Sequence, residues 1–291
     1  MKRLSSTCLA AVLAVSAVSL APSSVRAAES LEGCVGFIDS LPATIATQGV
    51  WCLREDLSTA MASGNAISVD TNNVTIDCNG YKVGGLAAGE ASTTRGIRAF
   101  NRQNTTVRNC ALRGFYHGVE LIGESGGGHL VEHNRFDQNL LRGIYIDGDN
   151  NLVRENRVFD TGGAPGVTTA WGMGGSADFI GNTISGGFVA GEETQFVYGI
   201  LLSGPGSVRD NIVRGLLHSE GAAGQTTGIR VGGGASGAII QHNHVTAAEP
   251  GFNGYGIWGN TVDSAICSGN IVSGFVGGIG ECHDGGGNAS H

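Results

Sequence analysis

A dense group of charged and aromatic residues lies between positions 95 and 147. An imidazole and a phenol can exchange protons, carboxylates can serve as acid, base or nucleophile, and arginine can bind a carboxylate in a bidentate manner. The candidate catalytic residues are His117, Glu120, Arg142, Tyr145 and Asp147. The candidate substrate-binding residues are Arg95, Arg98, Trp171, Tyr198, Arg230, Tyr255 and Trp258. The residue types therefore point to acid–base chemistry on an acidic ligand.

Two reactions fit these groups. In β-elimination, one of the arginines would neutralise a substrate carboxylate, while His117 and Tyr145 would move the protons. Hydrolysis needs two carboxylates flanking the bond, and Glu120 and Asp147 would offer them at a Cα separation of roughly 8 Å. We favour elimination over hydrolysis, and a face of solvated charges without any reaction is the third alternative.

The later part of the chain is richer in tryptophan and tyrosine. Aromatic rings pack on sugar faces, and arginine favours carboxylates, so we expect an acidic, uronate-containing polysaccharide as the partner. A glycan-binding or surface scaffold without catalytic activity is the alternative. His242 and His244 share a strand face but lack a third ligand, and no metal-ligating residue is predicted.

The elements that must position these groups come from an internal repeat. A Gly-Ile or Gly-Val phrase recurs at Gly96, Gly118, Gly143, Gly199, Gly228, Gly256 and Gly278, and Gly172-Met173 fills the gap in the series. Successive glycines are 22 to 29 residues apart. Self-similarity at this period indicates a solenoid.

A second phrase, apolar-x-x-Asn, lies between the copies of the first. It ends at Asn134, Asn156, Asn182, Asn211 and Asn243, and Cys110 and Asn270 extend the column. Each unit then holds short alternating strands, which bury their apolar face by stacking coil on coil at about 4.8 Å. We expect the asparagines to form an internal hydrogen-bonded ladder with a structural role.

Strand alternation decides which side chains face outward. Ile and Val of the repeated phrase point inward, so Arg98, Glu120 and Tyr145 point outward. The turns after the Asn strands lengthen along the chain and leave one edge of the coil. We expect them to form a wall, and the wall and the sheet to form a groove.

These repeats resemble those of the right-handed parallel β-helix family, whose fold is shared with pectate-lyase-like enzymes. The opening segments Ser40–Ile45 and Asn73–Gly80 are also similar to that family. The resemblance implies an all-β chain with a single right-handed parallel β-helix of about nine coils and an N-terminal cap. It assigns residues 28–64 to the cap and 65–291 to the β-helix.

Lyases of this family often use calcium held by clustered acids. The nearest equivalent here is Asp70, Glu120 and Asp147, which is a sparse set. The resemblance therefore allows calcium, but no cofactor is firmly implied.

Residues 1–27 have the pattern of a secretory signal, with Lys2 and Arg3 before an apolar run from Leu9 to Ala21. The run is too short to span a bilayer, and we expect no membrane insertion. Without the leader the chain has 14 basic and 25 acidic residues, a net charge of −11, which disfavours nucleic acid as a partner. We expect a periplasmic or secreted protein and make no prediction of its oligomeric state.

Six cysteines remain after the leader, an even number that favours disulfides in an oxidising compartment. Six cysteines allow fifteen pairings. Adjacency in the repeat order favours Cys34–Cys52, Cys78–Cys110 and Cys267–Cys282.

Overall fold

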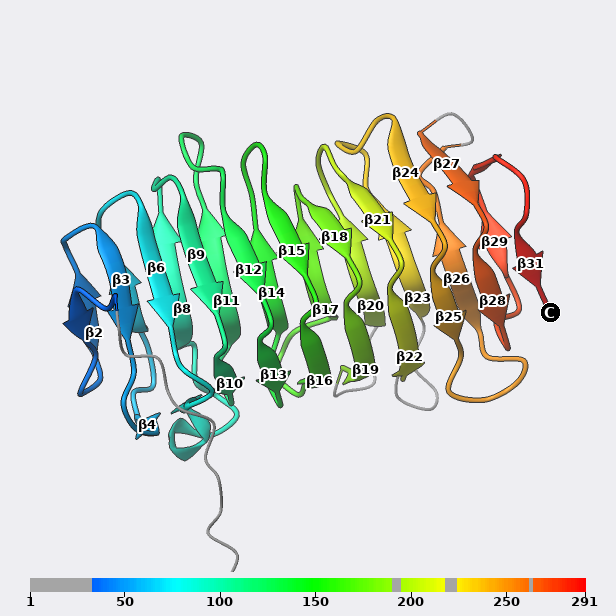
Figure 1. Ribbon diagram of the computed structural model, residues 1–291. Coiled ribbons are helices and arrows are strands. Elements are labelled where there is room, and N and C mark those ends of the chain that lie inside the picture. The colour runs from blue at the N-terminus through cyan, green and yellow to red at the C-terminus, as the bar shows by residue number, and fades with distance from the viewer. Residues whose placement is uncertain (1–32, 190–194, 218–223, 262–263) are drawn as a thin grey trace, which may run out of the picture. The chain divides into compact units, whose positions relative to one another are not determined.

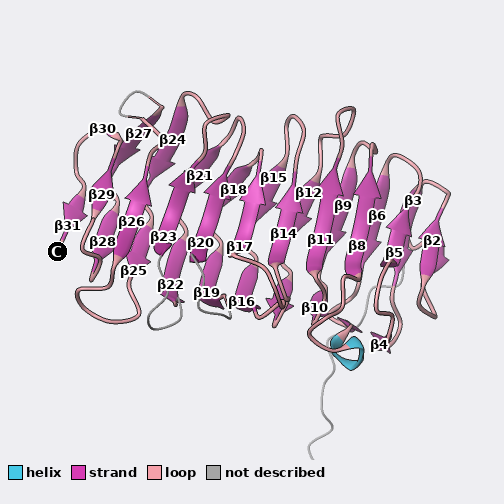
Figure 2. Ribbon diagram, turned by 180° about the vertical axis from the view of Figure 1, so that it is seen from behind, coloured by secondary structure: helices cyan, strands magenta, loops and turns pink. Residues whose placement is uncertain are grey.

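A computed structural model of the chain describes residues 33–189, 195–217, 224–261 and 264–291. Nearly all of its regular structure is β-strand, and its strands stack along one axis from β2 to β31 (Figure 1). The only helix in these ranges is the short 3-10 helix η1 (Leu86–Ala88), which lies near β4 in Figure 2. No helix in the described part of the chain is long and apolar enough to cross a membrane.

Three parallel sheets make up the solenoid. Sheet 1 contains β2 (Ala43–Ile45), β5 (Asn65–Val69), β8 (Arg95–Phe100), β11 (His117–Ile122), β14 (Arg142–Ile146), β17 (Thr169–Gly175), β20 (Gln195–Leu202), β23 (Gly224–Val231), β26 (Gly254–Trp258) and β29 (Ile279–Gly280). Sheet 2 contains β1 (Gly36–Phe37), β3 (Gly49–Cys52), β6 (Val74–Asp77), β9 (Thr105–Arg108), β12 (Leu130–Glu132), β15 (Leu152–Arg154), β18 (Asp178–Ile180), β21 (Ser207–Arg209), β24 (Ala238–Gln241), β27 (Ala265–Ser268) and β30 (His283–Asp284). Sheet 3 contains β4 (Leu57–Ser58), β7 (Lys82–Gly84), β10 (Ala111–Arg113), β13 (Arg135–Asp137), β16 (Arg157–Gly162), β19 (Thr183–Phe188), β22 (Ile212–Leu216), β25 (His244–Thr246), β28 (Ile271–Ser273) and β31 (Ala289–Ser290).

Each coil contributes one strand to each sheet in turn, and each strand pairs with the equivalent strand of the next coil. The predicted right-handed parallel β-helix is thereby confirmed. Strands β1 to β4 lie in the segment expected as the N-terminal cap, and they already pair with the strands of the following coil. The expected leader, residues 1–27, lies outside the described residues.

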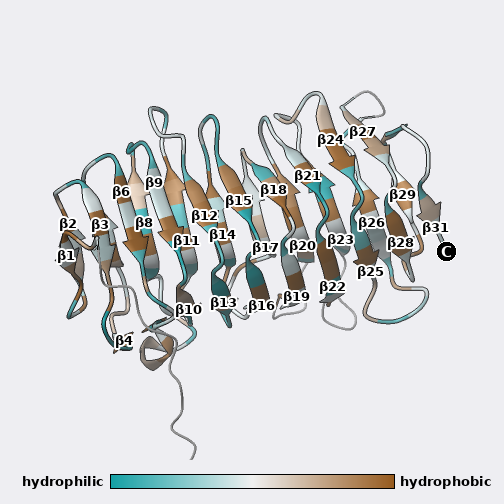
Figure 3. Cartoon of the chain, in the orientation of Figure 1, coloured by the Kyte–Doolittle hydropathy of each residue, from teal (hydrophilic) through white to brown (hydrophobic). Residues whose placement is uncertain are grey.

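The apolar residues of the repeated phrase form one internal column. Ile97, Val119, Ile144, Met173 and Ile200 follow one another in register and are fully buried. Figure 3 shows the resulting alternation of apolar and polar residues along the strands. The strand phase expected from the sequence is therefore correct.

The asparagines form the expected ladder at the corner between sheets 2 and 3. In each step, one side-chain amide donates to the side-chain oxygen of the asparagine in the next coil, at 3.0 to 3.1 Å. The ladder runs through Asn134, Asn156, Asn182, Asn211, Asn243, Asn270 and Asn288. Because most of its members are buried, the ladder fixes the stacking of coils from within.

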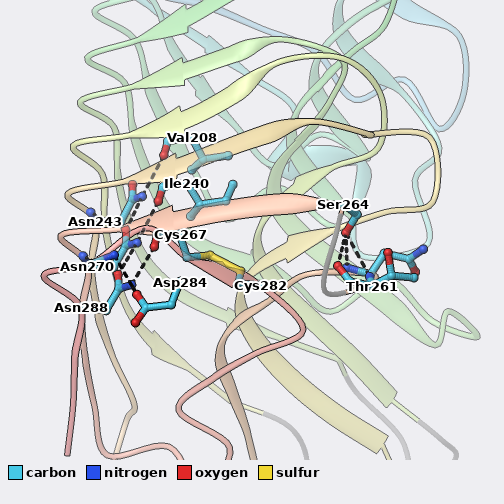
Figure 4. The surroundings of a disulfide bond; sticks show 12 residues. Val208, Ile240, Asn243, Thr261, Ser264, Cys267, Asn270, Cys282, Asp284 and Asn288 are labelled. Carbon is cyan, nitrogen blue, oxygen red and sulfur yellow. Dashed lines mark hydrogen bonds between the residues drawn. A yellow bond between two sulfur atoms is a disulfide. The ribbon is translucent and has the colours of Figure 1, made fainter.

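All three predicted disulfides are present: Cys34–Cys52, Cys78–Cys110 and Cys267–Cys282. Cys110 donates its backbone N–H to Asn134, so the second disulfide continues the asparagine column toward the N-terminus. The third closes the last coils next to the end of the ladder at Asn288 (Figure 4). Disulfides of this kind are typical of proteins that fold in an oxidising compartment.

Candidate functional site

Adjacent strands of sheet 1 bring the central candidate residues together. The register places Arg95 beside His117 and His117 beside Arg142 in one column. A second column on the same face runs from Arg98 through Glu120 to Tyr145. We call this group on β8, β11 and β14 the arginine cluster: Arg95, Arg98, His117, Glu120, Arg142 and Tyr145.

The Glu120 carboxylate is the centre of the arginine cluster. Its Oε2 lies 2.6 Å from Nε of Arg95 and 2.7 Å from Nε of Arg98, and its Oε1 lies 2.7 Å from Nδ1 of His117. The two guanidinium contacts fall outside the angles of a hydrogen bond, so we regard them as ionic. Glu120 points outward from the sheet, as expected, but the three partners bury it to 2 % exposure.

Opposing effects act on the Glu120 carboxyl group. Burial raises its pKa, whereas the hydrogen bond to His117 and the charges of Arg95 and Arg98 lower it, and the net pKa lies below the ordinary value. Glu120 is therefore a stable carboxylate with both oxygens engaged. A group in this state cannot deliver a proton as a general acid.

His117 is held as a neutral base. Burial lowers the pKa of its imidazole, and the positive charge of Arg142 adds to this effect, although the Glu120 hydrogen bond opposes it. A neutral imidazole that faces a carboxylate through Nδ1 carries its proton there, which leaves the lone pair on Nε2. Nε2 is buried and has no hydrogen-bond partner among the described residues.

Aromatic rings surround this imidazole. Tyr116 stacks on His117 with ring centroids 4.9 Å apart, and Tyr145 meets it edge-on at 6.1 Å. On the far side of Tyr145 lies Trp171, at a centroid distance of 6.0 Å. The base is thus enclosed by rings, and a ligand reaches Nε2 only after a side chain moves.

Arg142 differs from the other two arginines of the cluster. Its Cζ lies 4.4 Å from the centroid of the Tyr145 ring and 4.1 Å from that of Trp171. Within the described part of the chain it forms no salt bridge, and burial lowers the pKa of its guanidinium. A half-buried cation that lies over two rings is well suited to accept a ligand carboxylate.

The fifth candidate catalytic residue, Asp147, lies apart from these contacts. Its Oδ1 accepts hydrogen bonds from the Ser176 hydroxyl and the Gly148 N–H, in the turn after β14. These bonds give Asp147 a role in the turn, and among the described residues no hydrogen bond or salt bridge joins it to the arginine cluster.

The remaining candidate residues continue along the same face. Trp171 and Tyr198 are neighbours in the column of Arg142, and Arg230 and Trp258 lie in the column of Tyr145. Tyr255 and Trp258 contact each other with centroids 4.1 Å apart. Sheet 1 thus carries a cationic end on β8 to β14 and an aromatic end on β17 to β26.

Sequence analysis missed two residues of this face. Tyr116 precedes the strand and supplies the ring that stacks on His117. Thr227 lies between Tyr198 and Tyr255 in register and is fully buried. The sequence does contain a signal for Thr227. This residue directly precedes the repeated Gly228-Ile229 phrase, as the candidates Trp171 and Tyr198 precede the glycines of their own coils.

The two larger of three cavities in the described part of the chain lie elsewhere on the solenoid. One, of about 490 Å³, is lined by Leu86, Leu140 and Phe188, and another, of about 540 Å³, lies around Pro250 and Phe275. Neither includes a candidate site residue. The groove expected along sheet 1 therefore remains a prediction.

Calcium does not fit two of the three acids named for it. Glu120 already has cations on Oε2 and an imidazole on Oε1, and Asp147 is bonded in its turn. In the described ranges, no group of three or more His, Cys, Asp or Glu residues could hold a metal ion. We therefore derive no step through calcium.

Comparison with known proteins supports the fold. A family model described as a right-handed beta helix region matches residues 56–213. Among curated proteins there is no significant match.

Similar solved structures include three carbohydrate-active proteins. The A-module of a mannuronan C-5 epimerase from Azotobacter vinelandii is 15% identical, with a TM-score of 0.43, and the match covers 88% of this chain and 80% of that one. An alginate lyase from Paenibacillus is 13% identical, with a TM-score of 0.38 and coverages of 86% and 98%. The catalytic domain of a GH87 alpha-1,3-glucanase is 12% identical, with a TM-score of 0.28 and coverages of 87% and 62%. These values are too low to carry an inference about activity.

Proposed function

This chain belongs to the right-handed β-helix family, whose fold serves many activities, and from its site we propose that it is a secreted protein that cleaves an acidic, uronate-containing polysaccharide by β-elimination. One observation carries the proposal: a neutral, buried His117 contacts the Glu120 carboxylate and the Tyr145 ring, next to the cation Arg142, which forms no salt bridge with the described residues. The leader pattern and the three disulfides support secretion.

The roles follow from the charges. Arg142 binds the substrate carboxylate and makes the proton on the neighbouring carbon more acidic. His117 Nε2 accepts that proton, and the Tyr145 phenol donates one to the leaving oxygen. Glu120 holds the proton on Nδ1, so that Nε2 keeps its lone pair, and stabilises the imidazolium that forms.

Arg95 and Arg98 then have a different role from the one expected of them. Both guanidinium groups contact Glu120, and they keep it ionised beside His117. They position the base and do not bind substrate. Hydrolysis is disfavoured for the same reason, because Glu120 has neither a proton to give nor a free oxygen to attack with.

The shielding of His117 Nε2 favours a second candidate function. In the unliganded chain this atom is buried, so a carboxylate on Arg142 could be held without any proton transfer. The protein would then be a glycan-binding scaffold that uses the same face of sheet 1.

An assay on a panel of uronate polysaccharides tests these alternatives. Elimination produces an unsaturated uronate that absorbs in the ultraviolet together with a new reducing end, hydrolysis produces only the reducing end, and a scaffold produces neither. The variants His117→Gln, Tyr145→Phe and Arg142→Gln should each lower turnover by about 10²-fold or more. His244→Gln and Arg157→Gln are matched controls, because both residues are exposed on sheet 3.

Two results would contradict the proposal. Unsaturated products at near-wild-type rates in the three site variants would move the chemistry away from the arginine cluster. Binding of a polysaccharide without any product would favour the scaffold.

A further inference from the structure

A second cationic and aromatic group lies farther along the same face of sheet 1. The register places Thr227 between Tyr198 and Tyr255 in one column. In the other column, Arg230 pairs with Trp258 of the next coil. We call these five residues on β20, β23 and β26 the Arg230 cluster.

Arg230 is a cation without an acidic partner in the described part of the chain. Its Cζ lies 5.7 Å from the centroid of the Trp258 ring, and Trp258 in turn contacts Tyr255. Burial raises the pKa of the Tyr198 phenol, and the charge of nearby Arg230 opposes that shift. A half-buried guanidinium that contacts a ring and forms no salt bridge with the described residues has hydrogen-bond donors available for an anion.

Thr227 provides an independent sign of a ligand at this position. The residue is 0 % exposed, and its Oγ1 has no hydrogen-bond partner among the residues that the structure describes. Buried hydroxyl groups are normally satisfied, and one that is not points to a missing partner. It lies on the outer face of sheet 1, in the column between two tyrosines, and a bound polar group would reach it once a covering side chain moves.

The spacing relates this cluster to Arg142. Arg142 is on β14 and Arg230 on β23, three coils later, which corresponds to a rise of roughly 14 Å. Arg142 is in register with Thr227, and Arg230 lies three residues further along the strand, so the two Cα atoms are roughly 17 Å apart. The two coils between them present Trp171 and Tyr198 in one column, and Gly174 and Leu201 in the other. The face therefore offers two cationic points with an uncharged, partly aromatic surface between them.

We infer that the Arg230 cluster is a second carboxylate-binding subsite, and that the ligand is an extended uronate chain long enough to reach from Arg142 to Arg230. The inference rests on the proposed function, because Arg142 is its first subsite. Arg230 and Thr227 contact one carboxylate, Arg142 contacts another, and the sugar faces between them pack on Trp171 and Tyr198. An extended chain of about four sugars covers this span of three coils.

Binding of size-defined oligouronates tests the inference without any need for turnover. Oligomannuronates and oligogalacturonates, from the monomer to the hexamer, are titrated calorimetrically. In the wild-type protein we expect affinity to rise by about tenfold or more at about the tetramer, where the second carboxylate contact forms. Arg230→Gln should abolish this step.

Further variants separate the parts of the site. Thr227→Val removes the hydroxyl at constant shape and should reduce the step. Arg230→Lys keeps the charge without the bidentate fork and should reduce it as well. Arg157→Gln is the matched control, because it removes an exposed arginine from sheet 3, and the step should persist. Circular dichroism confirms that each variant is folded.

The outcomes distinguish this inference from the proposed function. Length-independent binding, or a step that persists in Arg230→Gln, overturns the second subsite and leaves the proposed function intact. Loss of the affinity step in Arg157→Gln also overturns the second subsite, because the step would then depend on the net charge of the protein and not on Arg230. If the wild-type protein binds no oligouronate, both the proposed function and the inference are wrong.

Discussion

Replacing Asn182 by alanine should cost far more stability than the same change at the end of the asparagine ladder. Asn182 Oδ1 accepts hydrogen bonds from the backbone N–H and the side-chain amide of Asn156, and its Nδ2 donates to Val153 O and to Asn211. The substitution removes four buried bonds, each worth about 1 kcal/mol net. We therefore expect a loss of about 4 kcal/mol in the free energy of unfolding, a large part of the stability of a typical domain.

Asn288 is the matched control for this prediction. It makes the same four types of bond, to Asn270 N and Nδ2, to Cys267 O and to Asp284, but it is half-buried at the end of the ladder. Water can replace these bonds, so Asn288→Ala should cost about 1 kcal/mol.

Urea unfolding followed by circular dichroism measures both losses, and amide hydrogen exchange adds a local readout. Solenoids can unfold in parts, so the exchange of the Asn156 N–H, which bonds to Asn182, is the more direct probe. Equal losses in the two variants, or unchanged protection of Asn156, would refute the argument that burial makes the inner bonds valuable.

Two further predictions concern buried titratable groups. Burial lowers the pKa of His129 to about 4, and its Nδ1 accepts a hydrogen bond from the Thr105 N–H. The free energy of unfolding should therefore be highest above pH 6.5 and should fall by about 3 kcal/mol as the pH falls toward 4. His129→Asn should flatten this decline in unfolding titrations, and an equally steep decline in the variant would count against it. Glu120→Gln leaves Arg95 and Arg98 without their carboxylate and should cost about 3 kcal/mol at neutral pH. Because the folded pKa of Glu120 is depressed, its contribution is lost as the pH falls through that value, so wild type and variant should converge in acid, and a constant difference across the pH range would contradict this reading.

Sequence alone predicted the features that repeat from coil to coil. The Gly-Ile phrase fixed the strand phase, and the structure buries Val119 and Ile144 while Tyr145 faces outward. The disulfides were predictable because stacking brings neighbours in the repeat order together, as for Cys78 and Cys110. A periodic pattern constrains every coil at once, so one irregular coil does not obscure it.

The roles of the site residues could not be predicted in the same way. Alternation places Arg95, Arg98 and Glu120 on one face, but it does not say that both arginines close over the same carboxylate. That outcome depends on which of several possible ion pairs the long side chains of adjacent coils form. The same limit applies to Thr227. Its burial depends on the sizes of the side chains beside it, such as Tyr198, and the repeat pattern does not give these sizes.

The ladder and the candidate site are connected through the coil spacing. The hydrogen bonds between successive asparagines hold neighbouring coils at one rise, from Asn134 to Asn288. The strands that carry Arg142 and Arg230 belong to these same coils, so the distance between the two cations is set by three rises and by three residues along a strand, and not by loop conformation. A rigid spacing favours a ligand that is itself regular, because an extended polymer can present a carboxylate at each end of the span with little loss of conformational entropy. The internal asparagines thereby set the geometry on which the proposed recognition at the outer face depends.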